Sequence, residues 1–318
     1  MKSLHALSLF IFAIIAFGCT DRQKADDEAK SAAQSPVSSN IVEVVSRGFS
    51  FEAPSEIPSG WTTFRYRNES AATHFVLLDR MPDGKGVAEQ QSEVAPVFQD
   101  GMNLLNAGEV EAAIARFGEL PEWFAQIVFM GGPGLTAPGQ TSETTVYLEP
   151  GTYVMECYVK TNGIFHSYNP NPSQYGMVLE FTVTSEASNA PEPTADLNIT
   201  LSSARGIEIE GEVTPGEHTV SVYFEDQVVH ENFVEQDDHL VRISEDTDLE
   251  ELGTWINWMN PTGLETPAPG EFLGGTNELP AGSTAYFTVN LEPGYYAWIS
   301  EVANPTQKGM LKAFTVGL

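Results

Sequence analysis

The sequence predicts an all-β protein with two β-sandwich or β-barrel domains in tandem, the first carrying an inserted helical segment. Short runs alternate polar and apolar residues between Gly, Pro or Asn turns, which is the pattern of half-buried strands. Two halves of the chain repeat the same motifs in one order. A Pro- and Ser-rich stretch at 185–196 separates these halves and is typical of an interdomain linker.

The clearest strand signals lie in the first half, at residues 62–67, 145–148 and 153–157. In the last of these, Tyr153, Met155 and Cys157 share one face, which we expect to point into the core. Apolar residues recur near helical spacing within 94–129, so one or two helices are predicted there. Residues 248–258 form a shorter equivalent in the second half.

Matching residues support the duplication. Gly60 and His74 align with Gly216 and His230 at the same spacing. Further on, Leu-Glu-Pro-Gly occurs at 148–151 and 291–294, and Gly-Met occurs at 176–177 and 309–310. Several matches in one order indicate two copies of one unit. The predicted domains are therefore residues 41–184 and 197–318.

The composition excludes nucleic-acid binding. The 318-residue chain has 15 Lys and Arg against 44 Asp and Glu, which gives a formal net charge of −29. Phosphate contacts need clustered cations, so such a chain is repelled by nucleic acids. Its 42% hydrophobic content excludes wholesale disorder. The acidic surface is either a solvated face or a docking face for a basic partner.

The N-terminus predicts a targeting signal. Residues 1–18 combine Lys2 with an apolar run that is too short to span a bilayer, which is typical of a signal peptide. The following Cys19 resembles the lipidated cysteine of bacterial lipoproteins. The resemblance implies a lipid anchor in the membrane, and Thr20 after the cysteine favours the outer membrane. Phe17 is unusual for such a lipobox, so an ordinary cleaved signal stays open.

Residues 19–40 are predicted to be a flexible tether, because they are almost without apolar content. Lipid on Cys19 and this tether would place the folded part in the cell envelope. If Cys19 is acylated, Cys157 is the one thiol left in an oxidising compartment, and no intramolecular disulfide can form. Cys157 is then either a buried core residue or a ligand.

The order of motifs resembles the cupredoxin family, small Greek-key sandwiches related to plastocyanin and azurin. The resemblance covers both halves and is most specific from Leu-Glu-Pro-Gly at 148–151 to Gly-Met at 176–177. Carried over by position, the type 1 copper ligands are His74, Cys157, His166 and Met177. The resemblance implies one-electron transfer with a redox protein partner.

The chemistry of this set suits copper. Two imidazoles and a thiolate form a trigonal set, and an axial thioether tunes the redox potential. The chain between Cys157 and Met177 is longer than in blue-copper proteins. Loop closure costs only ~0.6 kcal/mol for each doubling of loop length, so entropy does not exclude the site. Whether His166 reaches Cys157 stays open at this point.

The second half is predicted to bind no metal. Ser300 stands where the first half has Cys157, and no histidine lies between Ser300 and Met310. Of the carried-over ligands, the alignment leaves His230 and Met310. A hydroxyl does not replace a soft sulfur ligand. His218, His230 and His239 with the acids at 237–238 match no known zinc spacing.

No catalytic motif is present: G-x-S-x-G, Walker A and H-E-x-x-H are all missing from the sequence. We therefore expect a protein that is not an enzyme. The first hypothesis is a lipid-anchored copper protein that transfers one electron at a time. The alternative is a copper-free surface module that contacts a partner through its acidic faces or inserted helices.

Overall fold

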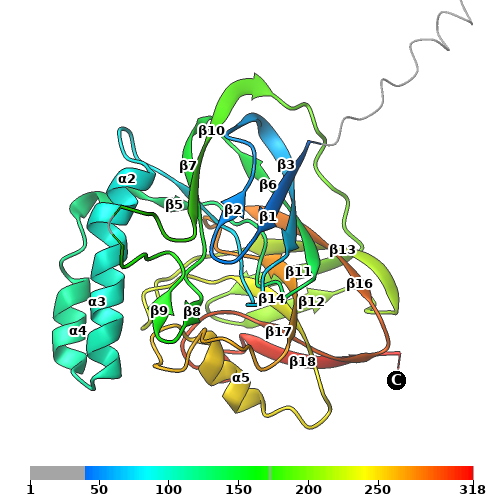
Figure 1. Ribbon diagram of the computed structural model, residues 1–318. Coiled ribbons are helices and arrows are strands. Elements are labelled where there is room, and N and C mark those ends of the chain that lie inside the picture. The colour runs from blue at the N-terminus through cyan, green and yellow to red at the C-terminus, as the bar shows by residue number, and fades with distance from the viewer. Residues whose placement is uncertain (1–39, 172, 318) are drawn as a thin grey trace, which may run out of the picture. The chain divides into compact units, whose positions relative to one another are not determined.

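The computed structural model describes residues 40–171 and 173–317, which form one unit (Figure 1). The predicted signal peptide, the predicted lipidation site at Cys19 and the predicted tether up to residue 39 lie outside the described residues. Within the described part, no helix combines the length and apolar character needed to cross a bilayer.

The first half folds into a β-sandwich. Its strands are β1 (Ile41–Ser46), β2 (Phe51–Glu52), β3 (Glu56–Asn68), β4 (Leu77–Arg80), β5 (Val128–Phe129), β6 (Thr141–Leu148), β7 (Gly151–Glu156), β8 (Lys160–Thr161), β9 (Ile164–Phe165) and β10 (Val178–Ala187). Strand β3 belongs to both layers, because its start pairs with β10 and its remainder pairs with β6. Gly60, with a φ of 103°, lies where β3 passes from one layer to the other.

The second half repeats this plan. Its strands are β11 (Leu197–Ser202), β12 (Gly206–Glu210), β13 (Gly216–Phe224), β14 (Asp238–Ile243), β15 (Glu271–Thr276), β16 (Thr284–Leu291), β17 (Gly294–Ile299) and β18 (Leu311–Val316). In both halves the first strand pairs in parallel with a long strand. In both, the strand after the Leu-Glu-Pro-Gly motif lies between two antiparallel neighbours. The predicted tandem all-β architecture is confirmed.

The two sandwiches share a sheet. Strand β16 of the second pairs antiparallel with β6 of the first, from Tyr286 opposite Thr145 to Thr288 opposite Glu143. Strand β10 continues to Ala187 and β11 begins at Leu197, so β10 extends into the predicted linker at 185–196. The domain boundaries themselves stay a prediction.

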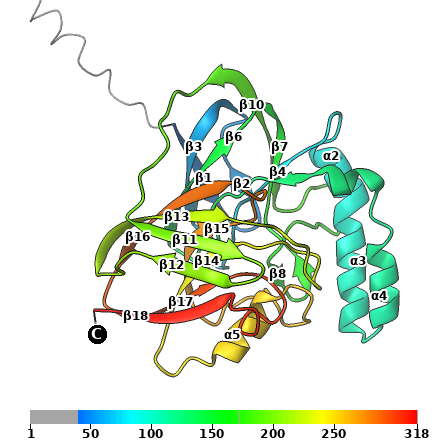
Figure 2. The ribbon, with the colours of Figure 1, turned by 180° about the vertical axis from the view of Figure 1, so that it is seen from behind.

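Helices lie at one side of the molecule, where α3 and α4 pack against each other (Figures 1 and 2). They are α2 (Val87–Glu89), a π-helical turn (Gln90–Val94), α3 (Ala95–Asn106), α4 (Val110–Phe117) and a 3-10 helix (Glu122–Gln126). The predicted helical insertion is confirmed, although helix starts earlier than residue 94. In the second half, α5 (Leu249–Ile256) confirms the shorter equivalent, with the Asp248 carboxylate accepting hydrogen bonds from the first turn.

Candidate metal centre

Three predicted ligands meet inside the first sandwich. The Nδ1 atom of His74 lies 3.4 Å from the Cys157 Sγ and 3.1 Å from the His166 Nδ1, and that Nδ1 lies 4.0 Å from the same sulfur. A metal bonded at about 2.0 Å to nitrogen and about 2.3 Å to sulfur separates its ligand atoms by roughly 3 to 4 Å. The three atoms therefore fit around one ion.

Local structure explains how Cys157 and His74 come together. Cys157 directly follows β7, and its side chain is fully buried with those of Tyr153 and Met155, as the alternation predicts. His74 precedes β4, which pairs with β7 in the same layer. The buried Asn68 amide donates to the carbonyls of Ala72 and Thr136, which shapes the loop around His74.

His166 follows the β8–β9 hairpin. Its Nε2 lies 2.8 Å from the Thr161 Oγ1, so the hydroxyl occupies that nitrogen and leaves Nδ1 facing Cys157 and His74. The backbone N–H of His166 donates to the Val159 carbonyl at 2.8 Å. Second contacts of this kind fix the orientation of a ligating imidazole.

The inserted helices and the second sandwich both brace this hairpin. The Gln99 side chain on α3 donates to the Gly163 carbonyl at 3.0 Å and accepts the Phe165 N–H at 2.9 Å. From the second sandwich, the Glu265 carboxylate accepts the N–H groups of Asn162 and Gly163. The long loop is therefore held from two sides, and His166 reaches Cys157, with its Nδ1 atom 4.0 Å from the sulfur.

Buried Lys160 adds a third brace. Its ammonium donates to the Trp258 and Asn260 carbonyls, both at 2.9 Å, although Lys160 belongs to β8 of the first sandwich. Burial lowers the pKa of this amine to about 8. These contacts tie the ligand hairpin to the chain after α5.

The electrostatics of the centre favour neutral imidazoles. Burial lowers the pKa of His74 to about 4, and the nearby Gly48 backbone raises it by a smaller amount. The Nε2 atom of this ring has no hydrogen-bond partner. Burial and the neighbouring His74 lower the pKa of His166 to about 3. Both rings are therefore uncharged near neutral pH, and each has one nitrogen with a lone pair that a metal can bind.

The thiol is held in its neutral form unless a cation binds. Burial raises the pKa of Cys157 to about 12, opposed by hydrogen bonds from the backbone of Phe75 and Val159. A metal ion favours the thiolate and compensates for burial of its charge. The Phe49 ring lies 4.4 Å from the His166 ring and is 54% exposed, so it covers the centre towards solvent.

The fourth predicted ligand, Met177, is fully buried beside this group. Its N–H donates to the His166 carbonyl at 2.6 Å, and its own carbonyl accepts the Cys157 N–H at 3.2 Å. Met177 therefore joins the two ligand segments through its backbone. The axial role of its thioether stays a prediction.

The second sandwich corrects one part of the alignment. Leu78 pairs with Met155 in the first sandwich, and Leu240 pairs with Trp298 in the second. Four residues before Leu78 lies His74, and four residues before Leu240 lies Gln236, so Gln236 and not His230 corresponds to His74. His230 lies in the loop before β14. The constant spacing that aligned it with His74 fails here, because the loops of the two halves differ in length. The correspondence of His230 with His74 is therefore wrong.

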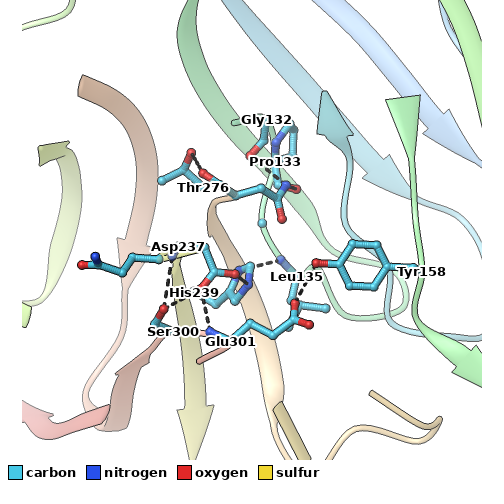
Figure 3. A network of polar contacts seen from close by, with 12 residues as sticks. Gly132, Pro133, Leu135, Tyr158, Asp237, His239, Thr276, Ser300 and Glu301 are labelled. Carbon is cyan, nitrogen blue, oxygen red and sulfur yellow. Dashed lines mark hydrogen bonds and ion pairs between the residues drawn. The ribbon is translucent and has the colours of Figure 1, made fainter. Parts of the chain in front are cut away.

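A different polar cluster fills that position, with Asp237, His239 and Glu301 close together and buried (Figure 3). The Asp237 carboxylate accepts the Ser300 hydroxyl at 2.8 Å and the Glu301 N–H at 2.6 Å. From the first sandwich, the Tyr158 hydroxyl donates to Glu301 at 3.1 Å. The cluster joins the two sandwiches.

This cluster does not suit a metal. The His239 Nδ1 accepts the Leu135 N–H at 3.2 Å, so the proton of the neutral ring is on Nε2. That Nε2 lies 2.7 Å from the Asp237 Oδ2 without the alignment of a hydrogen bond. A protonated nitrogen cannot be a ligand. His218 and His230 are not part of the cluster, so the zinc arrangement considered from the sequence is not assembled.

The strand order shows two β-sandwiches in tandem. No protein-family model and no curated protein matches the sequence. Among solved structures, auracyanin A, a blue copper protein from Chloroflexus aurantiacus, is 21% identical over 46% of this chain and 100% of its own, with a TM-score of 0.27. A multicopper oxidase is 14% identical over 87% of this chain and 88% of its own, with a TM-score of 0.21.

A copper-containing nitrite reductase from Thermus scotoductus is 15% identical over 87% of this chain and 61% of its own, with a TM-score of 0.21. The expectation that this chain is not an enzyme is contradicted, because the similar structures include oxidases and this reductase, which are enzymes.

Proposed function

We propose that the first sandwich binds one copper ion through Cys157, His74 and His166, with Met177 as an axial ligand, and transfers single electrons. The observation that supports this most is the convergence of one sulfur and two imidazole nitrogens within 4.8 Å in a buried site. When bound to such a set, copper supplies a one-electron couple whose potential depends on the axial ligand.

The residues divide the work of the site. His74 and His166 stay neutral and present nitrogen lone pairs, while the buried Cys157 supplies the sulfur. The braced hairpin keeps His166 in place, so little rearrangement is needed when the oxidation state changes. Phe49, packed against His166 and half exposed, marks the face on which a redox protein partner would dock.

We place the protein in the cell envelope, anchored by lipid on Cys19 in the outer membrane and held by the tether at 19–40. Support comes from the signal-like run at 1–18 and the cysteine that follows it. Mass spectrometry of the protein from membranes tests the anchor. A mature chain that begins with acylated Cys19 supports it, and an unmodified N-terminus contradicts it.

Titration of the purified protein with Cu(II) tests the copper proposal. We expect one copper per chain and an intense visible thiolate-to-copper band. Cys157→Ser should lose this band, whereas Ser300→Ala, the matched change in the second sandwich, should keep it. A colourless protein without bound copper would contradict the proposal and favour a copper-free interaction module.

A further inference from the structure

A cavity of about 850 Å³ lies between the inserted helices and the second sandwich, within the usual size range of small-molecule sites. It lies behind the candidate metal centre, since its lining includes direct neighbours of Cys157 and His166. The proposed function does not use this space. Its walls are mainly apolar and include the aromatic rings of Phe98, Phe117, Phe124, Phe165, Phe233 and Trp258.

The same cavity contains carboxylates that are buried and incompletely paired. Asp79 and Glu278 are each 2% exposed, and neither Asp79 Oδ1 nor Glu278 Oε2 has a hydrogen-bond partner. Glu156 and Glu235 also line the cavity and keep some exposure because they border its open space. The residues that line the cavity in the described chain include no Lys, Arg or His.

This combination is energetically unfavourable without a ligand. An unpaired carboxylate in an apolar setting is costly, and burial raises the pKa of Asp79 and Glu278 well above that of an exposed acid. Neighbouring acids raise both pKa values further. A positive group in the cavity would supply the missing partner, and the aromatic faces would also attract it.

The spacing of the acids argues against a bare metal ion. Among the described residues, metal-ligating side chains converge in two groups of three: His74, Cys157 and His166, and Asp237, His239 and Glu301. Neither group contains Asp79 or Glu278. An extended ligand fits better, with an apolar body on the aromatic walls and a charged end at the acids. Ile114 and Phe233, 52% and 49% exposed, line the cavity and connect it with solvent.

We propose that this cavity binds an apolar organic cation, an aryl-alkyl ammonium compound, with its ammonium group between Asp79 and Glu278 and its apolar body against Phe98, Phe165 and Trp258. Recognition rests on charge complementarity inside an apolar enclosure. The site does not require copper, so it stands or falls separately from the proposed function.

Calorimetry on the metal-free full chain at pH 7.5 tests this, with 2-phenylethylammonium as the cation and 2-phenylethanol as its uncharged counterpart. We expect the cation to bind at least tenfold more tightly than the alcohol and 3-phenylpropionate not to bind. Asp79→Asn with Glu278→Gln keeps the shape but removes the two acids that the proposal uses, so most of the preference should be lost although Glu156 and Glu235 remain in the lining. Phe233→Ala should weaken both neutral and charged ligands to a similar degree.

Three results would overturn the proposal: equal affinity for cation and alcohol, a preference that survives in the double variant, or no binding of the cation at millimolar concentration. Circular dichroism checks that the double variant is folded. If it is not, Asp79→Asn alone serves, with the preference expected to fall at least threefold and an unchanged preference counting against the site.

Discussion

The two sandwiches differ most in the loop that follows the strand after the Leu-Glu-Pro-Gly motif. In the first, the loop from Cys157 to Met177 contains a hairpin that delivers His166 to the sulfur. In the second, the loop from Ser300 to Met310 contains no histidine, and Ser300 binds Asp237 instead. One duplicated scaffold therefore holds a candidate metal centre in one copy and a structural polar cluster in the other.

The comparison also shows what the second copy contributes. Its Glu265 carboxylate and its carbonyls at 258 and 260 hold the hairpin of the first copy. The sandwich without metal ligands thus helps to position a ligand for the sandwich that has them. Substitutions that remove these contacts test whether the second sandwich positions the ligand hairpin of the first.

Lys160→Met should have the largest effect on stability. It preserves volume but leaves the buried Trp258 carbonyl and the half-buried Asn260 carbonyl without their donor, at a cost of about 2 to 4 kcal/mol. Urea unfolding measures this difference. The control Arg205→Met removes exposed ion pairs with Glu208 and Glu225 and should cost less than about 1 kcal/mol. Equal losses would mean that the bridge between the sandwiches is unimportant.

Gln99→Ala should weaken copper binding. Without the Gln99 amide, the backbone loses two hydrogen bonds, at Gly163 just before β9 and at Phe165 within it, so His166 is held less firmly. Loss of supporting contacts of this kind typically lowers metal affinity about 10- to 100-fold. Competitive titration against a chelator measures it. Gln140→Ala, which removes a surface amide bonded to Glu271, is the control, and similar affinities in both variants would refute the bracing role.

Glu278→Gln should stabilise the protein at pH 8. Burial and nearby acids raise the pKa of this carboxyl in the folded state, so the folded protein binds more protons than the unfolded chain above about pH 4. Stability from this group is complete below that pH and is lost as the pH rises through the folded pKa.

The amide cannot ionise, so the variant should gain on the order of 1 to 2 kcal/mol at pH 8 and little at pH 4. Thermal unfolding at the two pH values measures this. The exposed Glu210→Gln serves as control. A variant that is less stable than the parent at both pH values would show that Glu278 is held as a paired anion.

Met177→Leu should have the smallest effect on metal affinity, a change below about tenfold, while the redox potential shifts because the axial sulfur is gone. Voltammetry of the copper-loaded protein measures the potential. Met310→Leu changes the matching residue of the second sandwich and should leave the potential unchanged. Complete loss of copper from the Met177 variant would contradict an axial role.

Much of the fold could be predicted because the strands alternate clearly and the motifs repeat. Tyr153, Met155 and Cys157 are buried together, as their alternation requires. Sequence patterning did not show how far His166 reaches, because its position depends on Gln99 and Glu265, which are distant in the sequence. His230 was misplaced because counting along the chain fails across loops of unequal length.

The buried charged groups were missed as well. Asp79 interrupts the apolar run that starts at Phe75, and this break in an otherwise apolar strand was the available signal. Glu278 and Lys160 lie in segments whose patterns indicate surface loops. Their burial results from the packing of one sandwich against the other, which local patterning does not encode.

X-ray absorption at the copper edge tests the central claim most directly, since it reports the atoms bound to the metal. For the protein loaded with one copper, we predict one short sulfur contact and two imidazole nitrogens. A spectrum of oxygen and nitrogen ligands without the short sulfur contact would show that Cys157, His74 and His166 do not form the metal site.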